Sequence, residues 1–272
     1  MTYAGPPDPD SGIGIPDAVT DLVRGAEWIT VFSGAGMSAE SGIATFRDAQ
    51  SGLWEQFDPA ELATPEAWAR DPALVWGWYR RRAREVLAAL PNAGHRALAE
   101  LAGSRTMMVV TQNVDDLHER AGSDVVSHLH GSLFAPRCSL CGTPYDGPGA
   151  HPDPADDPAG DSPASDADLR VTPPTCPRCG GSVRPGIVWF GEPLPESDWQ
   201  RADQAFRAAE VVLVVGTSGI VYPAAALPER AVRAGIPVIE FNPAPSALSD
   251  IATHSLRMSA AVGLPALLAA IG

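Results

Sequence analysis

Four short apolar runs constrain the fold of this chain more than any other feature of its sequence. They span residues 28–32, 107–111, 211–215 and 237–241, and each is continuous rather than alternating in hydrophobicity. Runs of this kind are typical of parallel strands buried on both faces of a sheet. Because helical patterns such as 196–210 lie between them, we predict an α/β fold with a doubly wound parallel sheet. In such a fold the ligand binds at the carboxyl ends of the strands.

Two segments interrupt this alternation. Residues 64–90 have helical patterns with several aromatic residues, and 136–184 contain all four cysteines. We therefore predict a Rossmann-like domain and a smaller inserted lobe with a helical and a zinc-binding part. The domain comprises residues 14–47, 91–135 and 185–272, and the lobe comprises 48–90 and 136–184. Residues 1–13 and 146–174 are rich in Pro, Gly and Asp and predict a disordered tail and a mobile acidic loop.

The net charge of the chain limits which classes of partner it can bind. It has 33 acidic and 19 basic residues, a formal net charge of −14, which repels a phosphate backbone. We expect no nucleic-acid partner, and a zinc-ribbon nucleic-acid binder is disfavoured.

The apolar runs are far shorter than the roughly 20 residues that span a bilayer, and no signal sequence is seen at the N-terminus. We expect a cytoplasmic protein without a membrane partner, and a monomer.

The four cysteines form two Cys-x-x-Cys pairs, Cys138 with Cys141 and Cys176 with Cys179. In a reducing compartment this spacing indicates four thiolates around one zinc ion. Four thiolates leave no open position for water, so the zinc is expected to be structural. The 34 residues between the pairs exceed the roughly 15 to 20 that are common, but a longer loop adds little closure entropy.

Polar and glycine-rich segments follow the predicted strands. Gly34 and Gly36 would let the backbone approach a diphosphate, although the third glycine of the dinucleotide pattern is absent and a plain turn is the alternative. Asn113, Asp115 and His130 could position a ribose and move one proton. The alternative for these three is a capped helix start and a structural histidine.

Taken in order, these motifs resemble those of the sirtuins, NAD-dependent protein lysine deacylases. The resemblance runs from about residue 17 to 270. The motifs are 34–47, 111–115, His130-Gly131, the two Cys pairs, 188–192, 216–218 and Phe241-Asn242.

The resemblance implies a role for each matching residue. It implies His130, Asn113 and Asp115 as catalytic residues, with His130 as the general base on a ribose hydroxyl and Phe46 as a cover over the reacting sugar. The products would be free lysine, nicotinamide and 2′-O-acyl-ADP-ribose. The NAD-binding residues would be Gly34, Ala35, Gly36, Ser38, Glu40, Phe46, Arg47, Gln112, Asn113, Asp115, Gly216, Thr217, Ser218, Asn242 and Ala261. The acylated peptide would meet Ala63, Tyr79, Arg82, Val188, Trp189, Phe190, Gly191 and Val221.

Three of these residues indicate which acyl group is removed. Ala63, Tyr79 and Arg82 resemble the acyl pocket of sirtuins that remove succinyl and malonyl groups, and residues 79 and 82 share one helix face. We therefore expect desuccinylation and demalonylation, with deacetylation also possible in the larger pocket. The alternative is that the cluster of Arg80, Arg81, Arg82 and Arg84 is only a solvated helix face. For Trp189 and Phe190 the alternative is plain core packing.

One residue departs from the sirtuin pattern. Ala44 stands where the family usually has proline, so we expect weaker NAD binding or a more mobile loop. Two other functions remain open at this level. One is mono-ADP-ribosyl transfer, which uses the same ribose chemistry, and the other is a non-catalytic NAD-sensing module that binds peptides.

Overall fold

A six-stranded parallel sheet forms the centre of the larger part of the molecule. The computed structural model describes residues 14–44, 62–152 and 170–272, so the predicted N-terminal tail lies outside the described residues. The strand order is β3-β2-β1-β6-β7-β8. The strands are β1 (Trp28–Ser33), β2 (Thr106–Thr111), β3 (Val125–His128), β6 (Val211–Val215), β7 (Val238–Phe241) and β8 (His254–Leu256). This order confirms the predicted doubly wound α/β fold.

The two central strands decide where a ligand can bind. Strand β1 pairs with β2 on one side and with β6 on the other, so that Ile29 lies opposite both Met107 and Val211. All five residues of β6 are buried, as expected for a strand covered on both faces. The chain leaves β1 toward one edge of the sheet and leaves β6 toward the other. A crevice at the carboxyl ends of β1 and β6 is therefore the expected ligand site.

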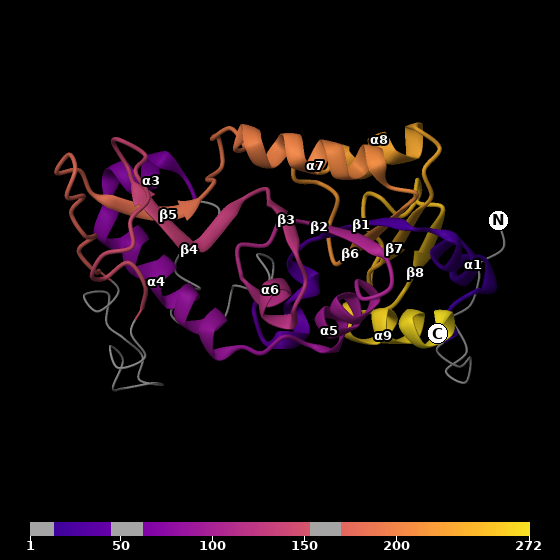
Figure 1. Ribbon diagram of the computed structural model, residues 1–272. Helices are drawn as coiled ribbons and strands as arrows, with labels where there is room; N and C mark the ends of the chain where they lie inside the picture. The colour runs from indigo at the N-terminus through magenta and orange to yellow at the C-terminus, as the bar shows by residue number, and fades with distance from the viewer. Residues whose placement is uncertain (1–13, 45–61, 153–169) are drawn as a thin grey trace, which may run out of the picture.

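Helices cover both faces of this sheet (Figure 1). Helices α1 (Asp17–Gly25), α5 (Ala93–Leu101) and α9 (Ala260–Ile271) pack on one face through a shared apolar core. Helices α7 (Glu196–Ala208) and α8 (Ala226–Arg233) pack on the other face. The helix predicted over 196–210 is α7, which ends at Ala208 because Ala209 adopts an extended conformation.

The smaller lobe combines helices with a two-stranded antiparallel sheet. Helices α3 (Pro65–Arg70) and α4 (Pro72–Ala88) begin with proline after side-chain caps from Thr64 and Asp71. Strands β4 (Gly131–Cys138) and β5 (Val183–Ile187) form the sheet. The predicted domain boundaries at 135 and 185 thus fall inside strands of the lobe. Of the predicted acidic loop, residues 153–169 lie outside the described residues.

Several short helices and strands of the structure were not predicted from the sequence. Strands β3 and β8 lie at the two edges of the large sheet, are only four and three residues long, and contain polar residues. Also unpredicted are helix α6 (Leu117–Ala121) and the 3₁₀ turns η1 (Ala35–Met37) and η2 (Ala39–Ser41). Elements this short carry too few residues to show a period.

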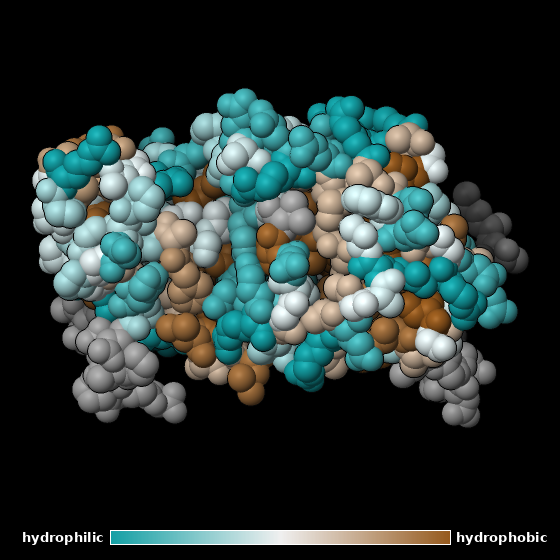
Figure 2. Space-filling view, viewed as in Figure 1, coloured by the Kyte–Doolittle hydropathy of each residue, from teal (hydrophilic) through white to brown (hydrophobic). Residues whose placement is uncertain are grey.

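The surface agrees with the acidic composition. Figure 2 shows hydrophilic side chains over much of the visible face, including the region of α7 and α8, and apolar colour in smaller patches. In the described part of the chain, no helix has both the length and the apolar character needed to cross a membrane.

Candidate active site

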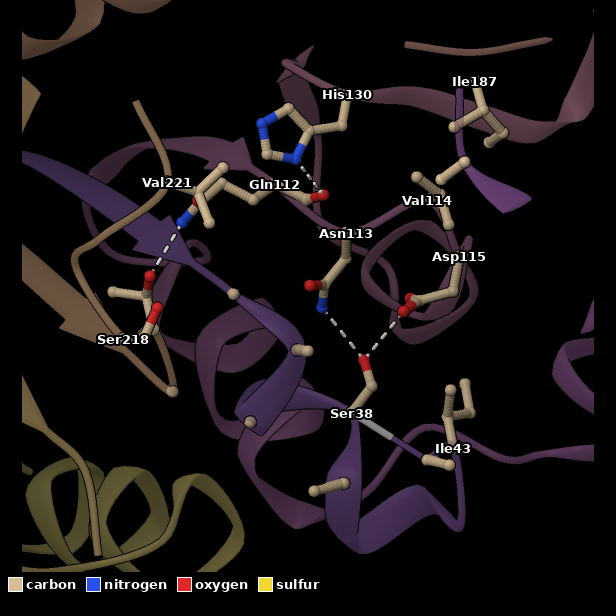
Figure 3. A pocket seen from close by; sticks show the side chains of 18 of the residues that line it. Ser38, Ile43, Gln112, Asn113, Val114, Asp115, His130, Ile187, Ser218 and Val221 are labelled. Atoms are coloured by element: carbon tan, nitrogen blue, oxygen red, sulfur yellow. Dashed lines mark hydrogen bonds between the residues drawn. The ribbon is translucent and has the colours of Figure 1, made fainter. Parts of the chain in front are cut away.

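A cavity of about 670 Å³ lies at the carboxyl ends of the central strands and extends to the smaller lobe. The loops after β1, β2 and β6 line one part of it, and α4 and the segment after β5 line the other. Figure 3 shows part of this lining, with Asn113, Asp115 and Ser38 pointing toward one another. The cavity thus lies at the position where a doubly wound sheet binds its ligand.

The hydroxyl of Ser38 connects the two predicted polar residues of the loop after β2. It donates to Asp115 Oδ2 at 2.9 Å and accepts from Asn113 Nδ2 at 3.1 Å (Figure 3). All three residues are buried, and burial raises the pKa of Asp115 while hydrogen bonds from Leu117 and Ser38 oppose this shift. Asp115 Oδ1 also accepts from the backbone N–H of Leu117 at the start of α6. Asp115 therefore has the capping role considered above and also lines the cavity.

His130 lies between the two parts of the molecule, just before β4. Its Nδ1 atom is 3.1 Å from the backbone carbonyl oxygen of Gln112. A carbonyl oxygen only accepts, so Nδ1 carries the proton and Nε2 has a free lone pair. Burial lowers the pKa of His130, and the hydrogen bond to Gln112 acts in the opposite direction. The ring is therefore neutral at pH 7 and can act as a base through Nε2.

The glycines after β1 join two loops that line the cavity. The N–H groups of Gly34 and Gly36 donate to the carbonyl oxygens of Val215 and Gly216, at 2.9 and 2.8 Å. A Cβ atom on Gly36 would lie 2.8 Å from Gly216 Cα, which is too close for any side chain. These two N–H groups therefore join the loops after β1 and β6, and the approach of a diphosphate to this backbone stays a prediction. In the described part of the chain, Ala35 N–H makes no hydrogen bond and lines the cavity.

Most of the other predicted NAD-binding residues also line the cavity. Gln112 Nε2 donates to Thr217 Oγ1 at 2.9 Å, and Asn242 Nδ2 donates to the Thr217 carbonyl at 2.8 Å. Glu40 lines the cavity, whereas Ala261 does not and instead donates its N–H to Glu40 Oε2. Of the predicted residues, Gly34, Ala35, Gly36, Ser38, Glu40, Gln112, Asn113, Asp115, Gly216, Thr217, Ser218 and Asn242 line it. Phe46 and Arg47 lie outside the described residues.

The predicted acyl-group residues line the same cavity as His130. They are Ala63, Tyr79 and Arg82. The other three arginines of the cluster on α4 are not part of the lining. Arg82 Nη2 lies 3.4 Å from the carbonyl oxygen of Ala44, and its guanidinium carbon lies 5.3 Å from the centre of the Trp78 ring.

The predicted peptide-binding segments also border the cavity. Val188, Trp189, Phe190, Gly191 and Val221 all line it. Trp189 is 2% exposed and belongs to the core of the smaller lobe, whereas Phe190 is 50% exposed. The core-packing alternative therefore describes Trp189 but not Phe190. The N–H groups of Val188 and Phe190 are bonded to His130 and Ala63 carbonyl oxygens, so they are not available to a peptide.

Sequence reasoning missed the apolar part of the lining. Ile43, Val86, Leu133 and Ile187 contribute to it. Each is an ordinary core residue in the sequence, and no local motif marks it as facing a cavity.

The four cysteines come together at the far side of the smaller lobe. Their Sγ atoms all lie within 4.8 Å of one another. Each pair is followed by a glycine with positive φ, Gly142 at 69° and Gly180 at 77°, and each glycine N–H donates to the carbonyl of the first cysteine of its pair. These turns aim both thiol groups of a pair at one point. Four converging thiolates fit one tetrahedral zinc ion.

Comparisons with known proteins agree with this geometry. The Sir2 family matches residues 34–223. NAD-dependent protein deacylase 2 of Corynebacterium efficiens is 51% identical over 254 residues, which cover 92% of this chain and 95% of the relative. The structure of a Sir2 homolog–NAD complex has a TM-score of 0.82 at 40% identity and covers 94% of each chain. The structure of Sir2Tm bound to a propionylated peptide has a TM-score of 0.74 at 29% identity and covers 94% of this chain and 99% of that chain. The resemblance to sirtuins is confirmed, and this chain belongs to the Sir2 family.

Proposed function

We propose that this protein is an NAD-dependent protein lysine deacylase that prefers negatively charged acyl groups such as succinyl and malonyl. The first part follows from membership of the Sir2 family and from the relative named above as an NAD-dependent protein deacylase. The acyl preference rests on one observation. Tyr79 and Arg82 line the same cavity as His130, the proposed general base.

The loops after the central strands are suited to hold NAD. Ala35 would meet the diphosphate through its backbone N–H, and Ser218 and Asn242 would lie at the adenosine ribose. Ser38 and Asn113 would orient the nicotinamide ribose and its carboxamide. Bound NAD would supply an electrophilic ribose carbon. NAD, acyl-lysine and one water molecule would together give nicotinamide, free lysine and 2′-O-acyl-ADP-ribose.

His130 would act as the base in this reaction. Its Nδ1–H is held by the Gln112 carbonyl, which leaves the lone pair of Nε2 to accept a proton from a ribose hydroxyl. Its lowered pKa keeps this atom unprotonated at neutral pH. The hydrogen bond to a backbone atom also fixes the orientation of the ring, which a proton transfer requires.

Arg82 and Tyr79 would recognise the acyl group. A guanidinium group matches the two oxygens of a carboxylate, and a phenol hydroxyl can donate one further hydrogen bond. Ala63 leaves room beside them. A charge-assisted hydrogen bond contributes about 1.5–3 kcal/mol, which corresponds to roughly tenfold or more in rate for a succinyl over an acetyl group. Deacetylation is still expected, because an acetyl group fits into the larger pocket.

The peptide would bind along Val188–Gly191 and Val221. The exposed side chains of Phe190, Ile220 and Tyr222 offer apolar contacts there. Because the N–H groups of Val188 and Phe190 are already bonded, backbone pairing with the peptide would use carbonyl oxygens of this segment. Such pairing selects an extended conformation more than a sequence, so broad peptide selectivity is expected. A cytoplasmic location and a monomeric state remain predictions.

The test is a comparison of one peptide carrying succinyl-lysine or acetyl-lysine, with products identified by mass spectrometry. The wild type should remove succinyl faster, and Arg82→Met should lower succinyl removal about tenfold or more with little effect on acetyl removal. Arg81→Met is the matched control, because Arg81 pairs with Glu85 on the surface and does not line the cavity. Removal of acetyl alone, unchanged by Arg82→Met, would show that the acyl preference is wrong.

Labelled NAD distinguishes deacylation from mono-ADP-ribosyl transfer and from non-catalytic NAD sensing. Label in a small acyl-ADP-ribose supports deacylation, whereas label on protein supports mono-ADP-ribosyl transfer. A protein that binds NAD and peptide but releases no nicotinamide would be a sensing module.

A further inference from the structure

The indole N–H group of Trp189 donates a hydrogen bond to the hydroxyl oxygen of Tyr79, with 3.1 Å between Nε1 and Oη. An indole N–H can only donate, so the phenol oxygen accepts in this bond. The hydrogen of the phenol itself therefore remains available for another acceptor. Within the described residues, Trp189 is the one hydrogen-bond partner of this hydroxyl. Both side chains line the cavity and are buried, at 6% exposure for Tyr79 and 2% for Trp189.

We infer that Trp189 is a positioning residue for acyl selectivity, because it orients the Tyr79 hydroxyl as a hydrogen-bond donor toward a negatively charged acyl group. The inference rests on the proposed function and deepens it. A free phenol can donate or accept, so it does not by itself distinguish a carboxylate from other groups. With its oxygen already accepting from Trp189, the hydroxyl presents its hydrogen, and a carboxylate is an acceptor only.

This arrangement also works against uncharged acyl groups. The methyl end of an acetyl group offers no acceptor to the Tyr79 hydrogen. A buried donor that loses its partner is unfavourable, so an acetyl group should bind less well beside this hydroxyl. Trp189 would therefore raise selectivity both by favouring a carboxylate and by penalising its absence.

The Trp189 side chain is itself held in place from several sides. The guanidinium carbon of Arg184 lies 3.4 Å from the centre of its ring, and the ring of Trp68 lies 5.7 Å away. Arg184 makes two hydrogen bonds to the Glu192 carboxylate, at 2.5 and 2.9 Å. The same carboxylate accepts from the backbone N–H of Trp189 at 2.9 Å. The indole N–H thus has a defined direction, which a positioning role requires.

The protonation state of Tyr79 is consistent with a donor role. Burial raises its pKa well above the usual value of a tyrosine, although the Trp189 hydrogen bond and the charges of Arg82 and Arg184 act in the opposite direction. The hydroxyl therefore keeps its hydrogen over the pH range in which the protein works.

A double-mutant cycle tests the inference. The readout is the ratio of kcat/KM for succinyl-lysine to kcat/KM for acetyl-lysine in one peptide. Tyr79→Phe removes the hydroxyl and should lower the ratio about tenfold or more. Trp189→Phe keeps an aromatic ring without the N–H and should lower the ratio about three- to tenfold. In the Tyr79→Phe background, Trp189→Phe should have no further effect on the ratio, because the hydroxyl that it positions is gone.

The control is Trp199→Phe, the same substitution at a tryptophan on α7 that contacts Arg230 and does not line the cavity. This variant should keep the wild-type ratio. The inference is wrong if Trp189→Phe also keeps that ratio, or lowers it equally with and without the Tyr79 hydroxyl.

Failure of the inference can be told apart from failure of the proposed function. A wild-type preference for succinyl that depends on Arg82 but not on Trp189 overturns the inference alone. A wild type with no such preference overturns both. If Trp189→Phe does not fold, benzothienylalanine at position 189 retains the bicyclic shape without the N–H, and the same outcomes apply to it.

Discussion

The Nδ1 atom of His130 lies 3.1 Å from the carbonyl oxygen of Gln112, and this contact determines which nitrogen of the ring can act as a base. It connects the loop after β2 with the start of β4, and so joins the large sheet to the smaller lobe at the cavity. The proton on Nδ1 and the lone pair on Nε2 follow from one acceptor-only partner.

The pH dependence of catalysis should reflect the burial of His130. Because burial lowers its pKa, Nε2 should stay unprotonated below pH 6.5, and kcat/KM should decline only at more acidic pH. His130→Ala should lower kcat by about 100-fold or more while the protein remains folded. Initial rates between pH 5 and 8 would measure this. An acid limb above pH 6.5 would contradict the assignment.

Loss of the Ser38 hydroxyl should impair catalysis without unfolding the protein. Ser38→Ala leaves Asn113 and Asp115 without the group that holds their side chains, so we expect kcat/KM for NAD to fall about 10- to 100-fold. The matched control is Ser104→Ala, because the Ser104 hydroxyl donates to the Leu101 carbonyl and neither residue lines the cavity. Equal rates for the two variants would show that the Ser38 bridge is unimportant.

Stability at acidic pH should depend on two buried histidines. His118 and His95 pack against each other with ring centres 4.9 Å apart, and burial lowers their pKa values to about 3 and about 4. In the unfolded chain each histidine would have a pKa near 6.5. Below that pH the unfolded state therefore binds more protons than the folded state. The free energy of unfolding should therefore fall between pH 6.5 and 4, by up to about 1.4 kcal/mol per pH unit for each histidine.

His118→Gln should weaken this dependence, since one of the two titrating groups is removed. Urea unfolding of the variant and the wild type at pH 7.5, 6 and 5 gives the two slopes. The partner of His118 Nε2 is Ser33 Oγ at 2.9 Å, and a glutamine amide can occupy the same position. Parallel curves would show that His118 does not stay neutral in the folded protein.

The cysteine cluster predicts one zinc ion per chain. Cys141→Ser should release the metal and lower the melting temperature by about 5 °C or more, because the lobe loses its cross-link. Ser139→Ala, within the same turn, should keep the metal. Atomic absorption and thermal unfolding would measure both effects. A purified protein free of zinc whose stability does not respond to zinc would contradict the assignment.

Local sequence patterns were enough to predict the core of the fold. Buried parallel strands have continuous apolar runs, and the amphipathic helix α1 has a 3.6-residue period, so both are visible within about ten residues. The cysteine pairs were equally clear, because metal ligation depends on a short fixed spacing. The edge strands β3 and β8 were not predicted, since they are only four and three residues long and contain polar residues, so they show no apolar run.

Tertiary structure alone decided the finer points of the site. Gly34 and Gly36 looked like a phosphate loop, but their N–H groups donate to Val215 at the end of β6 and to Gly216 directly after it, some 180 residues away in the chain. The alternative of a wholly solvated arginine cluster on α4 could be decided only by the fold, in which Arg82 lines the cavity and the other three arginines do not. Trp189 contacts Tyr79 across 110 residues of sequence. The sequence by itself determined the longer buried strands and helices, because their periodicity is local. The directions of individual hydrogen bonds depend instead on packing between segments distant in the chain.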